Sequence, residues 1–140
     1  MSTLEDSAPS AEAGTEQKRR AIIVDDSRAT RSLLRRLLVN LGYDTVEAGN
    51  GAEALEVLAA TERVHVALVD WNMPVMDGLE FVKTLRTHRA YADMIVVMVS
   101  AESDLTKMAR ALMVGADEFV IKPLTAEILQ VKLEMLEVRS

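Results

Sequence analysis

The chain has 140 residues and a formal net charge of −6. Acidic proteins are poor nonspecific ligands for nucleic acid, because a phosphate backbone is bound by clustered Lys and Arg. The lack of cysteine excludes disulfides, thiol catalysis and cysteine-ligated zinc, and no apolar run approaches the roughly 18 residues of a membrane span. We therefore expect one domain in the cytoplasm, without nucleic-acid or membrane partners.

The N-terminal segment differs in composition from the rest of the chain. Residues 1–19 are mostly small, polar and acidic until the basic residues at their end, and they offer almost nothing to bury. They also lack the basic-then-apolar plan of a secretory signal. We predict a disordered tail over residues 1–19 and a folded domain over residues 20–140.

Apolar, β-branched runs alternate with amphipathic segments from residue 21 onward. Residues 21–25 predict a buried strand, and Ser27 is a suitable cap for a helix over residues 28–41, which Gly42 ends. The apolar positions of this helix recur at helical spacing; they are Leu33, Leu34, Leu37, Leu38 and Leu41. A more polar strand over residues 43–48, placed nearer the sheet edge, precedes a helix over residues 52–60.

The second half repeats the alternation. Strands are predicted over residues 64–70, 94–100 and 118–122, and helices over 78–88, 104–114 and from Thr125 to about 138. Continuous apolar strands are buried on both faces, and helical connections between them imply parallel pairing. The sequence therefore predicts a doubly wound α/β fold with five parallel strands and five helices. Four methionines are expected to fill its core, namely Met94, Met98, Met108 and Met113.

Polar side chains stand at the ends of four predicted strands. Asp25 and Asp26 end the first strand, Asp70 the third, Ser100 the fourth and Lys122 the fifth. In an open parallel sheet, ligands bind outside the carboxyl ends of the strands. We therefore expect these carboxylates, the hydroxyl and the ammonium to converge at one edge.

This set of groups suits phosphoryl transfer. Carboxylates held close repel one another unless a cation joins them, and oxygen ligands of this kind suit Mg²⁺. A carboxylate can itself accept a phosphoryl group as an aspartyl phosphate. Lys122 and Ser100 are placed to meet the oxygens of that group. We interpret Asp70 as the phosphoryl acceptor.

Four stretches of the chain are typical of one family. They read "VDDS", "LVDWNMPVMDG", "VSAE" and "GADEFVIKP". Together they resemble the receiver domains of two-component response regulators, most closely the stand-alone chemotaxis type, and the resemblance covers residues 20–137. It implies a flavodoxin-like sheet with strand order 2-1-3-4-5 and a cis peptide bond between Lys122 and Pro123.

The resemblance also implies roles for the residues at the strand ends. Asp70 would be phosphorylated by a histidine kinase or a histidine phosphotransfer protein, and Ser100 and Lys122 would bind the transferred group. Mg²⁺ is the implied cofactor. Its implied ligands are Asp25, Asp26, Asp70 and the backbone carbonyl of Asn72.

Two further roles follow from the resemblance. Ser100 and Phe119 stand at the switch positions: phosphorylation would draw the Ser100 hydroxyl inward and free space that Phe119 fills by turning inward. Chemotaxis receivers usually carry Tyr at the position of Phe119, and a Phe can still turn inward but offers no hydroxyl. Asn72 and Glu102 stand where the family sets the rate of acyl-phosphate hydrolysis. Phosphorylation would alter the surface of the fourth helix, the fifth strand and the fifth helix.

The chain ends soon after its last predicted helix, so we expect its output to be a phosphorylation-dependent binding event. The effector would be a protein, with the flagellar switch as one candidate. A phosphate sink or phosphorelay shuttle without its own effector is the alternative. A small phosphatase of the haloacid dehalogenase type is a weaker one, because Asn72 stands where those enzymes have a second Asp. On the first two interpretations, the chain catalyses only its own phosphorylation and dephosphorylation.

Three arginines of the first helix permit two interpretations. Arg28, Arg31 and Arg35 are spaced so that they follow one face. An ordinary solvated face is one interpretation. Docking of an acidic kinase or phosphotransfer protein is the other, since opposite charges steer association.

Overall fold

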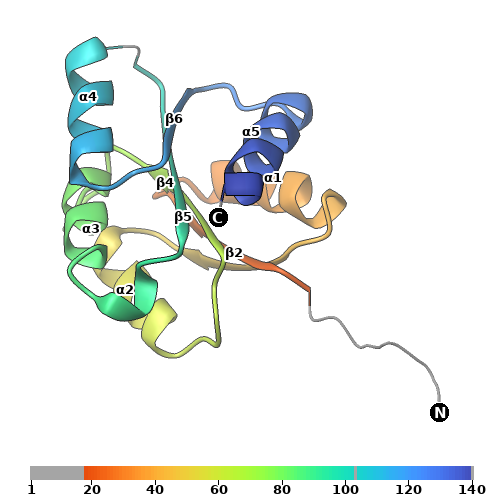
Figure 1. Cartoon of the computed structure of the whole chain (residues 1–140), viewed down its shortest axis with the longest axis horizontal. Coiled ribbons are helices and arrows are strands. Elements are labelled where there is room, and N and C mark those ends of the chain that lie inside the picture. The colour runs from red at the N-terminus through yellow and green to blue at the C-terminus, as the bar shows by residue number, and fades with distance from the viewer. Residues whose placement is uncertain (1–17, 103, 140) are drawn as a thin grey trace.

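A five-stranded parallel sheet forms the centre of the computed structural model, which describes residues 18–102 and 104–139 (Figure 1). The strands lie in the order β3-β2-β4-β5-β6, which is 2-1-3-4-5 when they are counted along the chain. This confirms the predicted fold and places the polar strand β3 at an edge. The strands are β2 (Arg20–Val24), β3 (Asp44–Ala48), β4 (Val66–Asp70), β5 (Ile95–Ser100) and β6 (Glu118–Ile121).

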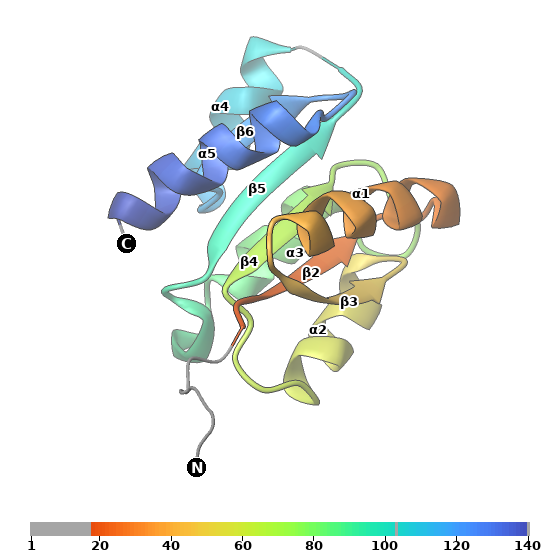
Figure 2. The same cartoon turned by 90° about the vertical axis from the view of Figure 1, so that its right-hand side faces the viewer.

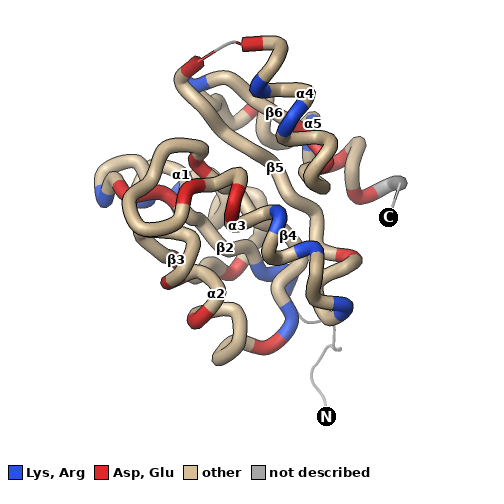
Figure 3. The backbone as a smooth tube through the Cα atoms, turned by 90° about the vertical axis from the view of Figure 1, so that its left-hand side faces the viewer, with Lys and Arg blue, Asp and Glu red and all other residues tan. Residues whose placement is uncertain are grey.

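Helices cover both faces of the sheet. One face carries α1 (Arg28–Asn40) and α5 (Ala126–Arg139), seen in front of the strands in Figure 2. The other carries α2 (Gly51–Ala59), α3 (Gly78–Leu85) and α4 (Leu105–Val114). Figure 3 views this second face and shows acidic and basic residues interspersed along it. Within residues 18–102 and 104–139, no helix combines the length and the apolar character that crossing a bilayer requires.

The alternation of side chains along each strand divides the core into two clusters. In β2, Ile22 and Val24 pack into the cluster beneath α2, α3 and α4. Ala21 and Ile23 pack into the cluster beneath α1 and α5. Because both faces are covered, the central strands are fully buried, which explains their continuous apolar sequences.

Side-chain caps set the beginnings of the helices. Ser27 Oγ accepts a hydrogen bond from the Thr30 N–H at 3.2 Å, as predicted for α1. Asp77 does the same for α3, where its Oδ1 accepts from the Glu80 N–H at 2.8 Å. Each contact satisfies a backbone donor that the helix itself leaves free.

The third helix is shorter than predicted. It ends at Leu85 rather than at residue 88, and a short 3₁₀ helix, η1 (Arg89–Tyr91), follows. Arg86 is the residue at the C-terminal cap of α3, and its guanidinium donates to Tyr91 O at 2.8 Å and Gly115 O at 3.0 Å and pairs with Asp117 at 3.1 Å. The helical spacing of apolar residues could not reveal these contacts of Arg86 with residues outside the helix.

Leu33 and Met113 lie at the surface, although the sequence placed Leu33 on the apolar side of a helix and Met113 in the core. Leu33 is 46% exposed and Met113 is 85% exposed. Leu33 neighbours the buried Leu34, and one residue along a helix turns a side chain by about 100°. The expectation that Met113 fills the core was wrong. Met94 and Met98 are buried, as expected.

The expected N-terminal tail lies mostly outside the described residues, which begin at Lys18. The last two residues of that segment already contact the folded domain. Lys18 lies 3.8 Å from a carboxylate oxygen of Asp44, and Arg19 Nε lies 3.1 Å from one of Glu137. Contact with the domain therefore begins no later than Lys18.

The loop between β4 and α3 contains a strained residue. Val75 has a φ of 68°, and its side chain is 83% exposed. A β-branched residue in this left-handed region is unfavourable by about 1–2 kcal/mol. Since the exposed side chain gains little from packing, the loop keeps Val75 at a net cost in stability.

Replacing Val75 by Asn should therefore stabilise the protein. Asn tolerates the left-handed region, so Val75→Asn should raise the free energy of unfolding by about 1 kcal/mol in urea titrations. Val75→Thr is the matched control, because it adds polarity and keeps β-branching. If Thr stabilises as much as Asn, backbone strain is not the cause.

Candidate functional site

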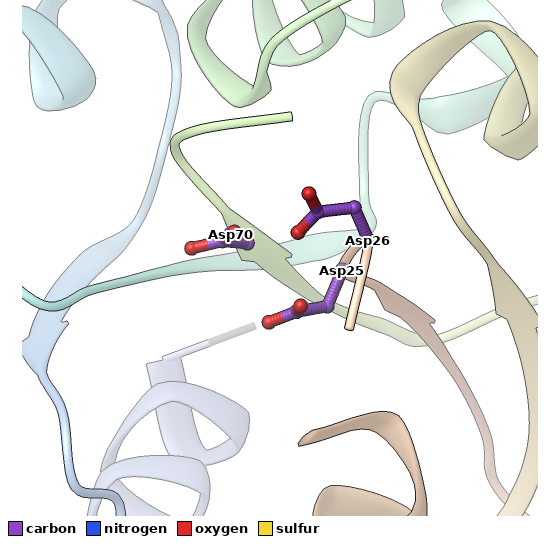
Figure 4. Close-up of side chains that lie close together, drawn as sticks. All are labelled: Asp25, Asp26 and Asp70. Atoms are coloured by element: carbon purple, nitrogen blue, oxygen red, sulfur yellow. The ribbon is translucent and has the colours of Figure 1, made fainter. Parts of the chain in front are cut away.

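Three carboxylates converge at the carboxyl ends of β2 and β4 (Figure 4). Asp25 and Asp26 directly follow β2, and Asp70 is the last residue of β4. One carboxylate oxygen from each lies within 4.8 Å of the others. Asp25 and Asp70 are buried, whereas Asp26 is exposed. The structure thus brings together the acidic residues that the sequence singled out.

Lys122 joins this cluster from β6. Its ammonium donates to Asp25 Oδ2 at 3.2 Å and to Asp70 Oδ1 at 3.3 Å. Strand alternation accounts for the meeting, because each of the three residues lies two positions after a strand residue of the core beneath α1 and α5. Those preceding residues are Ile23, Leu68 and Val120. The Lys122–Pro123 peptide bond is cis, as the resemblance implies.

The crowding of charges perturbs two pKa values. Burial raises the pKa of Asp70 above its ordinary value, the neighbouring carboxylate of Asp25 raises it further, and Lys122 opposes both only in part. Burial would lower the pKa of Lys122, but attraction to Asp70 and Asp25 outweighs it and raises that pKa. The cluster therefore holds more negative charge than its one lysine neutralises.

Ser100 and Phe119 approach from the opposite face of the sheet. Ser100 is fully buried, and its Oγ accepts a hydrogen bond from the Glu102 N–H at 3.2 Å. Phe119 is also buried, with its ring edge-on to Trp71 at a centroid distance of 6.3 Å. Phe119 therefore already lies inside the domain in this structure, whereas the resemblance implies that it turns inward from an outward position.

The loop after Asp70 is closed by its own backbone. The Gly78 N–H donates to Trp71 O at 2.8 Å, which brings both ends of the loop together. A Cβ atom at Gly78 would lie 2.2 Å from the backbone oxygen of Asp70, closer than any side chain permits. The Asp-Gly pair in the sequence therefore does two things: Asp77 caps α3, and Gly78 allows this close approach.

Asn72 and Glu102 lie exposed on the two loops that border the acidic cluster. Asn72 follows β4 by two residues, and Glu102 follows β5 by the same number. The Glu102 carboxylate pairs with Lys107 of α4. Since Asp70 and Ser100 end two adjacent, paired strands, these loops are neighbours at the carboxyl edge of the sheet.

Trp71 has contacts that the sequence did not reveal. It is buried, and the Lys107 ammonium lies 5.2 Å from the centroid of its ring. An ammonium over an indole face is attracted by the ring's electrons. Lys107 therefore connects the first turn of α4 both to Glu102 and to the residue that follows Asp70. An aromatic residue beside Asp70 was visible in the sequence, but its partner 36 positions away was not.

The arginines of α1 are partly engaged within the domain. Arg31 Nη1 donates to the backbone oxygen of Asp25 at 2.7 Å, and its Nε donates to Glu47 at 3.0 Å. Arg35 also reaches Glu47, at 3.5 Å, whereas Arg28 is exposed. The interpretation of all three as one solvated or docking face was therefore wrong for Arg31.

A cavity of about 780 Å³ lies at the other end of the sheet, near the starts of the strands. Arg19, His65 and Asp93 are among its lining residues. His65 Nδ1 accepts a hydrogen bond from the Arg20 N–H at 3.0 Å, and burial lowers the pKa of its imidazole. The ring is thus engaged in the fold, and the cavity contains none of the acidic cluster.

Comparison with known proteins agrees with this geometry. The family model described as "response regulator receiver domain" matches residues 21–134. A chemotaxis protein CheY homolog of Campylobacter jejuni is 41% identical over 114 residues, which cover 81% of this chain and 88% of the relative. Chemotaxis protein CheY1 of Helicobacter pylori is 36% identical over 115 residues, which cover 81% of this chain and 93% of the relative.

Solved structures show the same relationship. The structure of Vibrio cholerae chemotaxis protein CheY4 superposes with a TM-score of 0.80 and 32% sequence identity, covering 86% of this chain and 99% of that one. A probable response regulator/GGDEF domain protein gives a TM-score of 0.77 at 31% identity, but only 50% of its chain is covered. With the family match spanning most of the sequence, the chain belongs to the response regulator receiver domain family, a family of signalling proteins.

Proposed function

We propose that this chain is a chemotaxis-type response regulator of the cytoplasm that accepts a phosphoryl group on Asp70. The observation that carries the proposal is the position of the Asp70 carboxylate, which lies beside two other carboxylates and within 3.3 Å of the Lys122 ammonium. The names of the curated relatives, which are chemotaxis proteins, support the choice of pathway.

The transfer step would use Asp70 as the nucleophile. A bond forms between an Asp70 carboxylate oxygen and phosphorus, and the bond from phosphorus to the donor's histidine nitrogen breaks. The imidazole leaves with the electron pair and takes up a proton. Lys122 would neutralise a phosphoryl oxygen, and the Ser100 hydroxyl would donate to another. Water later attacks phosphorus, which restores the carboxylate and releases inorganic phosphate.

The acidic cluster is chemically suited to Mg²⁺. Its donors are carboxylate oxygens, the ligands that Mg²⁺ prefers, and Asp26 makes no hydrogen bond or ion pair with residues 18–102 or 104–139. We propose Asp25, Asp26, Asp70 and the Asn72 carbonyl as the residues that hold the ion. When bound, Mg²⁺ supplies positive charge between the carboxylates and the phosphoryl oxygens.

Output would begin at Ser100. Because its Oγ accepts the Glu102 N–H, a phosphoryl group that recruits the hydroxyl also acts on the loop leading to α4. Phe119 is already buried and would need no inward movement. The responding surface would then include α4, β6 and α5, and phosphorylation would favour one of two packings of this region. Asn72 and Glu102, on the bordering loops, would adjust the rate of hydrolysis.

Two alternatives predict different behaviour. A phosphate sink or phosphorelay shuttle would use the same site and bind no effector. A haloacid dehalogenase-like phosphatase is disfavoured, because the family match assigns this chain to the receivers and Asn72 stands at the second acidic position.

Incubation with radiolabelled acetyl phosphate and Mg²⁺ should label the protein on Asp70. Acetate leaves as the acyl phosphate forms, and hydroxylamine should release the label. Asp70→Asn should abolish labelling, and Lys122→Met should slow it at least about tenfold because a phosphoryl oxygen loses its counter-charge. Retention of the label by Asp70→Asn would contradict the assignment. Many turnovers of p-nitrophenyl phosphate would favour the phosphatase.

Asp70→Asn should also raise the thermal unfolding midpoint without divalent cations, by about 3 °C. The pKa of Asp70 is raised by folding, so its ionisation costs stability. The native state binds more protons than the unfolded state between the two pKa values, and the cost disappears as pH falls below the ordinary Asp range. Mg²⁺ should narrow the difference in midpoint between Asp70→Asn and wild type, because it stabilises the wild-type cluster more than that of the variant.

Asp93→Asn is the control for this measurement, because it removes one carboxylate at an exposed position near the start of β5. It should leave the midpoint and its Mg²⁺ dependence near those of wild type. Equal stabilisation by both variants would attribute the effect to net charge rather than to the cluster.

Effector binding can be tested with the chain as bait in a lysate of its source organism. One sample would contain Mg²⁺ and beryllofluoride, a mimic of the acyl phosphate, and the other Mg²⁺ alone. Capture of a flagellar switch protein only with beryllofluoride, and not by Asp70→Asn, is the expected result. Capture of only kinases or phosphotransfer proteins, equally in both samples, would favour the sink or shuttle.

A further inference from the structure

The peptide bond between Asp25 and Asp26 is held by an arginine from the neighbouring helix. Arg31 Nη1 donates to the backbone oxygen of Asp25 at 2.7 Å. The same guanidinium donates through Nε to Glu47 of β3 at 3.0 Å. The Arg31 side chain is only 18% exposed, so both contacts are partly buried. The guanidinium thus connects the end of β2 to the adjacent edge strand.

The two acidic residues of this peptide are fixed to different degrees. The Asp25 carboxylate accepts from the Ser27 N–H at 2.8 Å and from Lys122, and the Asp25 N–H donates to Ala48 O at 3.1 Å. The Asp26 carboxylate has no such partner among the described residues. Its direction therefore depends on the backbone from which it projects, and Arg31 holds the carbonyl immediately before it.

We propose that Arg31 is a positioning residue for the Mg²⁺ site, acting through the Asp25–Asp26 peptide and anchored by Glu47. This inference rests on the magnesium site of the proposed function. Arg31 touches neither the acceptor nor the ion, and its effect is to keep the Asp26 carboxylate aimed at those of Asp25 and Asp70. Groups that orient metal ligands in this way typically contribute tenfold or more to metal affinity.

The positive charge of Arg31 should lower Mg²⁺ affinity, whereas its positioning of the Asp25–Asp26 peptide should raise it. Loss of a positive charge near the cluster would favour a cation. That effect is small, because the Glu47 carboxylate neutralises the guanidinium. Arg35 provides a matched control, since it lies on the same helix and pairs with the same carboxylate at 3.5 Å without a described bond to Asp25.

Isothermal titration with MgCl₂ measures the effect directly. Arg31→Gln should weaken Mg²⁺ binding about tenfold, whereas Arg35→Gln should stay within about twofold of wild type. Arg31→Lys keeps the charge but cannot hold Glu47 and the Asp25 carbonyl with one planar fork, so it should weaken binding nearly as much. Glu47→Gln should give a smaller loss. Thermal unfolding establishes whether each variant is folded. If Arg31→Gln does not fold, Arg31→Lys provides the test.

Labelling by acetyl phosphate gives a second readout. If Arg31 acts only through metal affinity, its variants need more Mg²⁺ for half-maximal labelling but reach nearly the wild-type rate at saturation. Wild-type affinity in both Arg31 variants, or equal losses in Arg31→Gln and Arg35→Gln, would overturn the inference and leave the proposed function intact. A wild-type protein that binds no Mg²⁺ would overturn the metal site and the inference together.

Discussion

The ammonium of Lys122 is the interaction on which the rest of the site depends. It lies between the buried carboxylates of Asp25 and Asp70, about 3.2–3.3 Å from each, in a place where two negative charges would otherwise repel. One lysine does not balance three carboxylates, and burial together with the neighbouring Asp25 carboxylate keeps the pKa of Asp70 raised. The fold therefore maintains a site with an excess of negative charge, which a further cation would offset.

The parallel sheet is what brings these groups together. The central strands β4 and β5 are buried throughout, so their polar side chains appear only where they end. Alternation then sorts them, with Asp25, Asp70 and Lys122 on the side of α1 and α5 and Ser100 with Phe119 on the side of α4. One face assembles the acidic cluster and Lys122, while on the other the Ser100 hydroxyl contacts the Glu102 backbone in the loop that leads to α4.

Much of this arrangement follows from patterns within short stretches of sequence. The strands, their polar ends and the Ser27 cap are local features, and the sequence predicts them well. The contacts of Arg31 with Glu47, Arg86 with Gly115 and Lys107 with Trp71 join residues distant along the chain, and no period or motif indicates them. Arg31 illustrates the limit: its spacing predicts a surface residue, but its length allows it to reach back to the strand end.

Trp71 gives this domain a built-in optical probe. It is the sole tryptophan of the sequence, it directly follows Asp70, and its buried indole lies between the Phe119 ring and the Lys107 ammonium. Indole emission responds to nearby charge and to polarity. A change of charge at Asp70 or a displacement of α4 should therefore alter the emission of one identified chromophore, so stopped-flow experiments could follow either change without an added label.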